Sequence, residues 1–355
     1  MKKTMVYIGS YSSDSGEGIY PFEFDHAAGL LKPVRDPVHA ENPSYLTVSS
    51  DNRYLYVVSE TRKFAGTSGG GVAAYQIDEE GGLTFLNSTP TLGFDPCYLG
   101  TDKSNSFLVA ANYSGGSLSV FPLGTDGKIM PCSFVQTHRG SGPNQERQEM
   151  PHVHFTDFTP DGNHICTVDL GIDTVKFYRL DPKTGTLHEE EKLCIKLSPG
   201  SGPRHVVFRE QGRFVYVVTE LSCEIAVFQY VEGKYELRQC LSTVPPDFKG
   251  DNAAAALHSS PDGRFMYASN RGHDSIAAYK VGGDGLLEPC GVYSAQGRGP
   301  RDFAIEPCGN FLLAANEKSN EIAVLKIDSI SGALTPTGSR VELHSPTCIQ
   351  FRSIG

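Results

Sequence analysis

The 355-residue sequence lacks several features that would indicate particular partners or compartments. It has no apolar run of about 18 residues, so no segment is expected to span a bilayer. It has no block of basic residues, and 31 Lys and Arg against 41 Asp and Glu give a formal net charge of −10. We therefore expect neither nucleic acid nor a membrane as a partner. The start of the chain has no apolar core long enough for a signal peptide, which favours a cytoplasmic location.

Motifs for metals, nucleotides and covalent catalysis are absent or out of context. The nine cysteines are an odd number and include no Cys-x-x-Cys pair, so we expect reduced thiols in the core. No Gly-rich phosphate-binding loop of a nucleotide-binding family occurs. Gly66 to Gly70 fits Gly-x-Ser-x-Gly, but it lies in a loop between expected strands and not at a strand-to-helix turn. We expect no cofactor and no metal.

One pattern is repeated along the chain. A proline or small residue precedes an alternating apolar run, a turn with Asp, Asn or Gly follows, and a second β-rich run ends in a small or charged residue. Six turn residues, spaced 46 to 57 apart, mark the copies: Asn52, Asn105, Gly162, Gly212, Gly263 and Gly309. Periods of this length are typical of β-propellers, in which each unit is a four-stranded blade.

The two ends of the chain complete a seventh unit. The last copy, from Ser345 to Phe351, stops after one strand, whereas the N-terminus begins in the middle of a unit. Pairing of the ends closes the ring and removes the exposed edges of an open array. We therefore predict an all-β, seven-bladed propeller as a single domain over 1–355, with a split blade formed by 1–41 and 342–355.

The repeat places two sets of side chains on one face. In an up-and-down blade the start of the first strand and the end of the second lie at the same end of the sheet. The residues after the proline position are Ser44, Cys97, His154, Arg204, Ala255 and Arg301. The residues that end the second run are Tyr11, Glu60, Tyr113, Leu170, Glu220, Arg271 and Glu317. Basic groups and carboxylates are thus expected to meet at one mouth of the central channel.

Converging arginines in an acidic protein predict a small anionic substrate, because guanidinium groups bind carboxylate or phosphate bidentately. Glu220 or a neutral histidine could then act as a general base. The alternative is a ring of ion pairs that only neutralises buried strand ends. His152 and His154 could also bind a metal together with Glu220. The adjacent Arg204 disfavours a cation there.

Two long insertions precede the first strands of the third and fifth repeats, at 137–150 and 242–252. Each could cover the mouth as a lid, or could be an ordinary surface loop. Arg147, in the first of them, could join the anion site.

Several of these segments resemble the propeller lactonases, a family that includes bacterial 6-phosphogluconolactonases and the fungal carboxy-cis,cis-muconate cyclising enzyme. The resemblance extends over essentially the whole chain. Its most specific segments are RQEMPHVH at 147–154 and SNRGHDSI at 269–276, and others are GPRH at 202–205, VTE at 218–220 and GPRDF at 299–303.

The resemblance implies a catalytic set of His154, Arg204, Glu220 and Arg271, although the matching histidine could also be His152. We expect the remaining candidates to bind substrate; they are His152, Arg301, Arg147 and Glu317. The implied reaction is hydrolysis of 6-phosphoglucono-1,5-lactone, a small anionic sugar lactone, in the pentose phosphate pathway.

Two other functions stay open at this point. A cycloisomerase acting on a muconolactone would need the same arginines and acid and base groups. A scaffold that binds a protein would need exposed apolar side chains at the mouth, which the charged positions above disfavour. The sequence does not indicate an oligomeric state.

Overall fold

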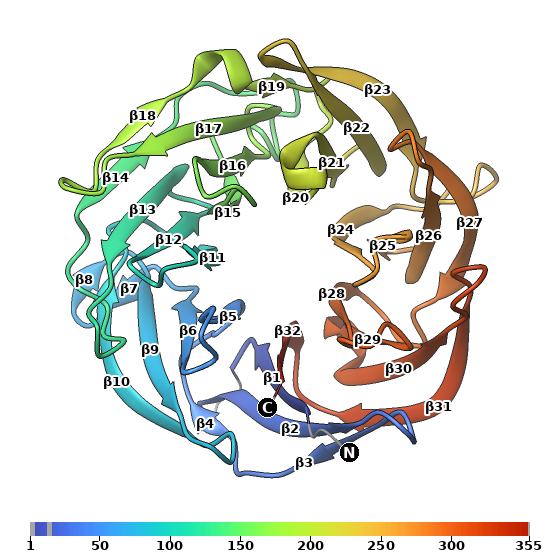
Figure 1. The fold of residues 1–355 in the computed structure, drawn as a ribbon, viewed down its shortest axis with the longest axis horizontal. Helices are drawn as coiled ribbons and strands as arrows, with labels where there is room; N and C mark the ends of the chain where they lie inside the picture. The colour runs from blue at the N-terminus through green and yellow to red at the C-terminus, as the bar shows by residue number, and fades with distance from the viewer. Residues whose placement is uncertain (1–3, 13–15, 354–355) are drawn as a thin grey trace.

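The computed structural model describes residues 4–12 and 16–353 and contains seven antiparallel β-sheets arranged in a ring, together with one separate two-stranded sheet (Figure 1). Each of the seven sheets is a blade, and in six of them the first strand lies next to the central axis and the last strand at the rim. The prediction of an all-β, seven-bladed propeller is confirmed.

Six blades are formed by consecutive strands. In chain order the first three are β5 (Leu46–Val48), β6 (Tyr54–Ser59), β9 (Gly71–Ile77) and β10 (Leu83–Pro90); β11 (Pro96–Thr101), β12 (Phe107–Asn112), β13 (Ser117–Pro122) and β14 (Phe134–Thr137); and β15 (Val153–Phe158), β16 (Ile165–Asp169), β17 (Thr174–Leu180) and β18 (Leu187–Glu189). The next three are β20 (Pro203–Arg209), β21 (Phe214–Thr219), β22 (Glu224–Val231) and β23 (Lys234–Ser242); β24 (Ala253–Ser259), β25 (Phe265–Arg271), β26 (Ser275–Val281) and β27 (Leu287–Ser294); and β28 (Pro300–Ile305), β29 (Phe311–Asn316), β30 (Glu321–Ile327) and β31 (Leu334–Glu342). Short additional elements are β7 (Lys63–Phe64), β8 (Thr67–Ser68), β19 (Ile195–Lys196), η1 (Glu191–Leu193), η2 (Glu210–Gly212) and η3 (Glu317–Ser319).

The seventh blade joins the two ends of the chain. β32 (Pro346–Ser353) is its innermost strand and pairs with β1 (Thr4–Ser10), which is followed outward by β2 (Glu17–Asp25), with β3 (Leu30–Pro33) and β4 (Val38–His39) at its edge. Of the ranges expected for this blade, residues 1–3, 13–15 and 354–355 lie outside the described residues. Closure by pairing of the two ends is confirmed, since Thr4 lies opposite Ser353 and Ile8 opposite Ile349.

A tyrosine in the second strand locks several blades to the next one. Its hydroxyl is buried and donates to a glycine carbonyl in the outer hairpin of the neighbouring blade. The pairs and distances are Tyr7 to Gly81, 2.9 Å; Tyr56 to Gly127, 3.2 Å; Tyr216 to Gly285, 2.7 Å; and Tyr267 to Gly332, 3.0 Å. A buried hydroxyl needs such a partner, so each lock fixes the distance between adjacent blades.

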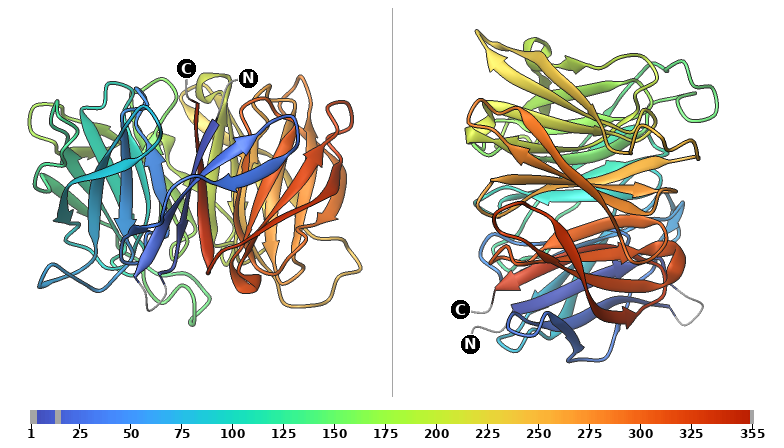
Figure 2. Two further views of the ribbon diagram at one scale, coloured as in Figure 1. Left: turned by 90° about the horizontal axis from the view of Figure 1, so that it is seen from below. Right: turned by 90° about the vertical axis from the view of Figure 1, so that its right-hand side faces the viewer.

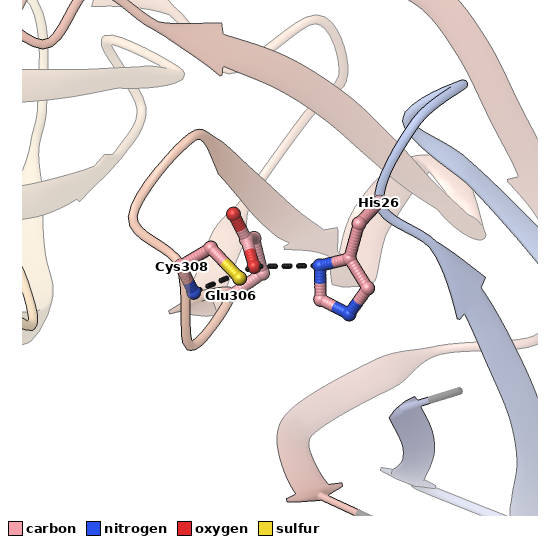
Figure 3. A group of neighbouring side chains, drawn as sticks. All are labelled: His26, Glu306 and Cys308. Atoms are coloured by element: carbon pink, nitrogen blue, oxygen red, sulfur yellow. Dashed lines mark hydrogen bonds and ion pairs between the residues drawn. The ribbon is translucent and has the colours of Figure 1, made fainter. Parts of the chain in front are cut away.

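The junction between the last blade and the split blade has an additional tie, shown in Figure 3. His26 Nδ1 lies 2.8 Å from Glu306 Oε2, and its other ring nitrogen lies 2.7 Å from the Thr4 hydroxyl. The buried Glu306 carboxylate also accepts the backbone N–H groups of Cys308 and Asn310, both at 2.8 Å. Glu306 therefore orders its own turn and holds the split blade in place.

Five of the innermost strands contain a single-residue β-bulge near their first residue. Pro203 pairs with Thr219 and His205 with Val218, which leaves Arg204 as an extra residue without an opposite partner. The same register shift makes Cys97, His154, Arg301 and Thr347 extra residues in their strands. Bulges re-aim side chains next to functional sites. Four of the six residues that follow the proline position in the repeat are thus bulge residues.

Aromatic rings fill the middle of the channel. The rings of Tyr45 and Tyr98 stack at 3.9 Å, and Tyr98 lies 5.2 Å from His205, which belongs to a blade two positions away. Phe155 packs on Tyr98 at 4.3 Å. These side chains separate the two mouths of the channel.

Beneath the aromatic rings is a cavity of about 370 Å³ that Asp157 and His258 help to line. A side chain on Gly100 would clash with the Asp157 carboxylate, since a Cβ atom there would lie 2.1 Å from Oδ1. Burial raises the pKa of Asp157 to about 7.

The two faces of the ring differ. Both ends of the described chain lie on one face, and the loops over 138–150 and 243–252 project from the other (Figure 2). Among the described residues, no helix is long and apolar enough to cross a membrane.

Candidate active site

Glu220 lies at the centre of a cluster of three arginines from separate parts of the chain. It follows β21, and its side chain is only 3% exposed. Its Oε2 accepts from Arg271 at 2.7 Å and lies 3.2 Å from Arg204 Nε, while Oε1 accepts from Arg147 at 2.5 Å. The structure therefore brings together four of the side chains that the sequence singled out.

The three guanidinium groups determine the charge of Glu220. Burial alone would raise the pKa of this carboxyl, but Arg271, Arg204 and Arg147 together hold it well below its usual range. Glu220 is therefore a carboxylate at neutral pH, with both oxygens facing arginines. A carboxylate in these surroundings fixes the orientation of its arginine partners and is a weak proton acceptor.

Arg204 is the most deeply buried of these arginines, at 3% exposure. Burial and the nearby Arg271 lower its pKa to about 10, against the attraction of Glu220. Its Nη1 lies 3.1 Å from His205 Nε2, whereas its Nε has no hydrogen-bond partner among the described atoms. Buried donors without a hydrogen bond are rare in native structures, and the contact that Nε makes is its ion pair with Glu220 at 3.2 Å.

His154 is the bulge residue of β15 and is 5% exposed. Its ring is 5.3 Å from Tyr113 and 5.5 Å from His205, and its Nδ1 lies 3.8 Å from the Cys97 thiol. Burial, together with Arg204 and Arg301, lowers the pKa of His154 well below its usual value. The imidazole is therefore neutral at physiological pH, with a lone pair on one of its ring nitrogens.

His152 takes a different position from His154. Its ring stacks on Tyr113 at 4.5 Å, its Nδ1 lies 3.2 Å from the Tyr113 carbonyl oxygen, and its Nε2 lies 3.3 Å from Glu149. Both ring nitrogens thus have partners near the rim of the mouth. His152 and Tyr113 form a flat wall that a ring-shaped ligand could contact.

The segment 138–152, which we call the strap, carries Arg147 to Glu220. Its middle is held by Gln148, fully buried, whose amide donates to Leu170 O at 2.9 Å and to Asp173 at 2.8 Å. Its two ends are held by one buried carboxylate, Asp169, which lies 2.7 Å from the His138 ring and accepts the His152 N–H at 2.8 Å. The strap is a fixed wall of the site.

The second long insertion, 242–252, makes different contacts. Phe248 packs edge-on against His273 at 4.6 Å, and Asn252 donates to Asn270 at 3.0 Å. It borders the blade that carries Arg271.

Arg301 forms a second cluster across the mouth. Its Nη1 and Nη2 lie 3.8 Å from Glu317 and 4.0 Å from Glu60, and its guanidinium lies over the Tyr11 ring at 5.2 Å. Within residues 4–12 and 16–353, no hydrogen bond uses its donors. Arg301 is thus held by charge and stacking while its N–H groups stay free for a ligand.

The two clusters border a shared cavity of about 10 Å³, lined in part by Ser44, Cys97, Arg204 and Arg301. This volume is close to the minimum that one water needs. Burial raises the pKa of Cys97, so this thiol is not a nucleophile at neutral pH.

The described residues offer one group of metal-ligand type, His26, Glu306 and Cys308. It lies at the tie described above, and its polar atoms already have protein partners. At the mouth, the arginines around Glu220 make a bound cation unfavourable.

All eight predicted site residues lie at or next to this mouth: four in the Glu220 cluster, Arg301 and Glu317 in the second cluster, and His152 and His154 beside Tyr113. Their roles stay predictions. The supporting residues Gln148 and Asp169 were not singled out by the sequence, because their hydrogen-bond partners lie in loops whose course the repeat does not specify. Glu60 and Tyr113 are among the residues that end the second run of a repeat, but they were not among the predicted site residues.

Known proteins resemble this chain over nearly its full length. A family model described as "Lactonase, 7-bladed beta-propeller" matches residues 5–351. A Bacillus subtilis (strain 168) protein named 6-phosphogluconolactonase is 38% identical over 355 residues, covering 99% of both chains. A Formosa agariphila protein of the same name is 32% identical over 353 residues, covering 98% of this chain and 99% of that relative.

A solved structure shares the same arrangement. The periplasmic gluconolactonase of Pseudomonas aeruginosa superimposes with a TM-score of 0.93 at 35% identity, covering 99% of this chain and 100% of that one.

Proposed function

Because this chain belongs to the seven-bladed β-propeller lactonase family and is a lactone hydrolase, we propose that its substrate is 6-phosphoglucono-1,5-lactone. The product would be 6-phosphogluconate, as in the pentose phosphate pathway. The observation that carries this proposal is the meeting of four guanidinium groups at one mouth of a protein with net charge −10. Such a site favours a phosphorylated over a neutral lactone.

The four arginines have different roles in this proposal. Arg204 and Arg271, aimed by Glu220, donate to the lactone carbonyl and stabilise the oxyanion that forms when water attacks. Arg301, with its free donors, binds the phosphate. Arg147, which belongs to the strap, forms one side of the site.

His154 is the proposed general base. Water attacks C1 of the lactone and transfers a proton to the neutral imidazole, which gives a tetrahedral oxyanion. Collapse of that intermediate breaks the bond between C1 and the ring oxygen, which takes up a proton and becomes the C5 hydroxyl of the open-chain acid. Glu220 and His154 are the two candidate bases. Because both carboxylate oxygens of Glu220 already accept from arginines, His154 is the favoured base.

The test is a background-corrected assay of lactone opening. We expect the wild type to prefer 6-phosphoglucono-1,5-lactone over glucono-1,5-lactone, mainly through a lower KM. Arg301→Ala should remove that preference, whereas His154→Ala should lower kcat by about 10²-fold or more on both substrates. Equal rates on both lactones, or a His154→Ala variant of near-normal kcat, would contradict the proposal.

A muconolactone cycloisomerase and a protein-binding scaffold were the alternatives from the sequence, and the relatives named as lactonases favour neither. Parallel assays with carboxymuconate would detect the first activity.

We also propose the cytoplasm as the compartment. All nine cysteines are free thiols, as is common in reducing compartments. Because a structural relative is periplasmic, cell fractionation is the appropriate test.

A further inference from the structure

Two glutamates occupy the same position in different blades but have opposite surroundings. Glu220 and Glu60 each directly follow the second strand of a blade. Glu220 faces three guanidinium groups. Glu60 instead accepts hydroxyl hydrogen bonds, from Tyr11 at 2.9 Å and from Ser44.

The charges around Glu60 are few. Arg301 Nη2 is 4.0 Å away and makes no hydrogen bond to it. Glu317, on the other side of Arg301, and Asp95 add negative charge nearby. Burial raises the pKa of Glu60, and Arg301, Ser44 and Tyr11 only partly oppose this. Two carboxyls whose environments drive their pKa values apart are a recurrent arrangement in acid and base catalysis.

Glu60 also lies where a proton is needed. Ser44, which donates to it, lines the cavity shared with Arg204 and Arg301. In the proposed substrate the phosphate sits on C6, and the ring oxygen sits on the adjacent C5. A phosphate held by Arg301 therefore brings the ring oxygen to the same side of the mouth as Glu60.

Resting on the function proposed above, we propose that Glu60 is a catalytic residue, the general acid that protonates the ring oxygen as the lactone opens. His154 takes the proton from the attacking water. The bond between C1 and the ring oxygen breaks, and the Glu60 carboxyl proton passes to that oxygen, which becomes the C5 hydroxyl. The product acid ionises, and Glu60 and His154 return to their starting states by proton exchange through solvent.

The kinetic test compares two substitutions of similar burial. The Glu60 side chain is 16% exposed and the Glu321 side chain is 15% exposed, and each faces an arginine. Glu60→Gln should lower kcat on the phosphorylated lactone by about 10²-fold or more, with product binding unchanged by calorimetry. Glu321→Gln should stay within about twofold of the wild type.

A change of leaving group separates proton donation from positioning. The corresponding thiolactone expels a thiolate, which needs little help from an acid, so Glu60→Gln should retain most of the wild-type rate on it. An equal loss on the lactone and the thiolactone would overturn the assignment, as would a Glu60→Gln variant of normal kcat.

A second measurement does not depend on the substrate. In protein labelled with ¹³C at glutamate Cδ, the Glu60 resonance, assigned with Glu60→Gln, should titrate above the other glutamates, and the Glu220 resonance below them. If the wild type opens no phosphorylated lactone, the proposed function fails, and a Glu60 resonance that titrates with the exposed glutamates rejects Glu60 independently.

Discussion

At the residue scale, a bulge at the start of five innermost strands decides which of their side chains reach the mouth. A regular strand would direct alternate residues to the channel, whereas the extra residue turns Arg204 and Arg301 toward the mouth while their neighbours still face the axis. The positive charge of the arginine cluster then lowers the pKa of Glu220 and keeps its carboxyl ionised. The site is thus an arrangement of charges held by backbone irregularities.

Glu220→Gln should destabilise the fold by about 3–5 kcal/mol, because it leaves buried arginines without a counter-charge. The pKa of Glu220 is lowered in the folded state, so its contribution is present above the ordinary carboxyl pKa of about 4.3 and is lost as pH falls below it. Urea unfolding at pH 7 and pH 3.5 should show a smaller loss on acidification for the variant. Glu210→Gln, which breaks an exposed pair with Arg213, should cost at most about 1 kcal/mol.

Asp157→Asn should have the opposite pH dependence. Burial raises the pKa of Asp157 to about 7, so folding favours its protonated form and stability declines as pH rises from about 4 to about 7. The amide variant should therefore have a higher urea midpoint than the wild type at pH 8 and a similar midpoint at pH 4. A lower midpoint at pH 8 would mean that the carboxylate has a stabilising partner.

The candidate residues could be found from the sequence because the repeat itself aligns them. His154, Arg204 and Arg301 share one position in the alignment, and Glu220 and Glu317 share another. Their protonation could not be predicted, since it depends on distances between blades. The contrast between Glu60 and Glu220 needs three-dimensional neighbours that no spacing reveals.

At the element scale, the strap contributes a wall through contacts at both of its ends and its middle. Gln148 and Asp169 fix it to the turn between β16 and β17, which places Arg147 on Glu220. The sequence left open whether this insertion is a lid, because loop composition does not indicate where a buried amide finds its partners.

A double-mutant cycle tests the role of the strap. Gln148→Ala should raise KM or lower kcat by about tenfold if it acts by placing Arg147. In the Arg147→Ala background the same substitution should then add less than about twofold. Additive losses would show that Gln148 acts on another part of the site, and a Tm change alone would make it purely structural.

Strand and turn positions were predictable for a local reason. In several first turns a Ser or Thr hydroxyl bonds the Asp two residues later, as in Ser49, Thr159 and Ser260 at 2.6 Å. The last blade uses Glu306 for the same task and recruits His26 from the opposite end of the chain, which no local pattern indicates.

At the scale of the whole molecule, stability depends on closing the ring. Removing residues 346–355 would delete the innermost strand of the split blade and expose the backbone edge of β1. We expect this truncation to abolish cooperative unfolding and to cause aggregation, as judged by calorimetry and size-exclusion chromatography.

A circular permutant provides the control. Thr4 and Ser353 are paired neighbours, so a short linker can join the ends while new termini open in the exposed hairpin at Glu232 and Gly233. The permutant should keep a Tm within a few degrees of the wild type. An unfolded permutant would mean that chain order, and not the strand itself, is what closure needs.

The position of β32 has a consequence for how the protein is made. β32, the innermost strand of the split blade, is synthesised after the other 31 described strands, so six blades and most of the seventh precede the strand that closes the ring. Until then the nascent chain carries an unpaired strand that could bind a chaperone or a neighbouring chain. A translation product stalled before β32 should therefore be protease-sensitive, and one stalled after β32 has emerged should be resistant.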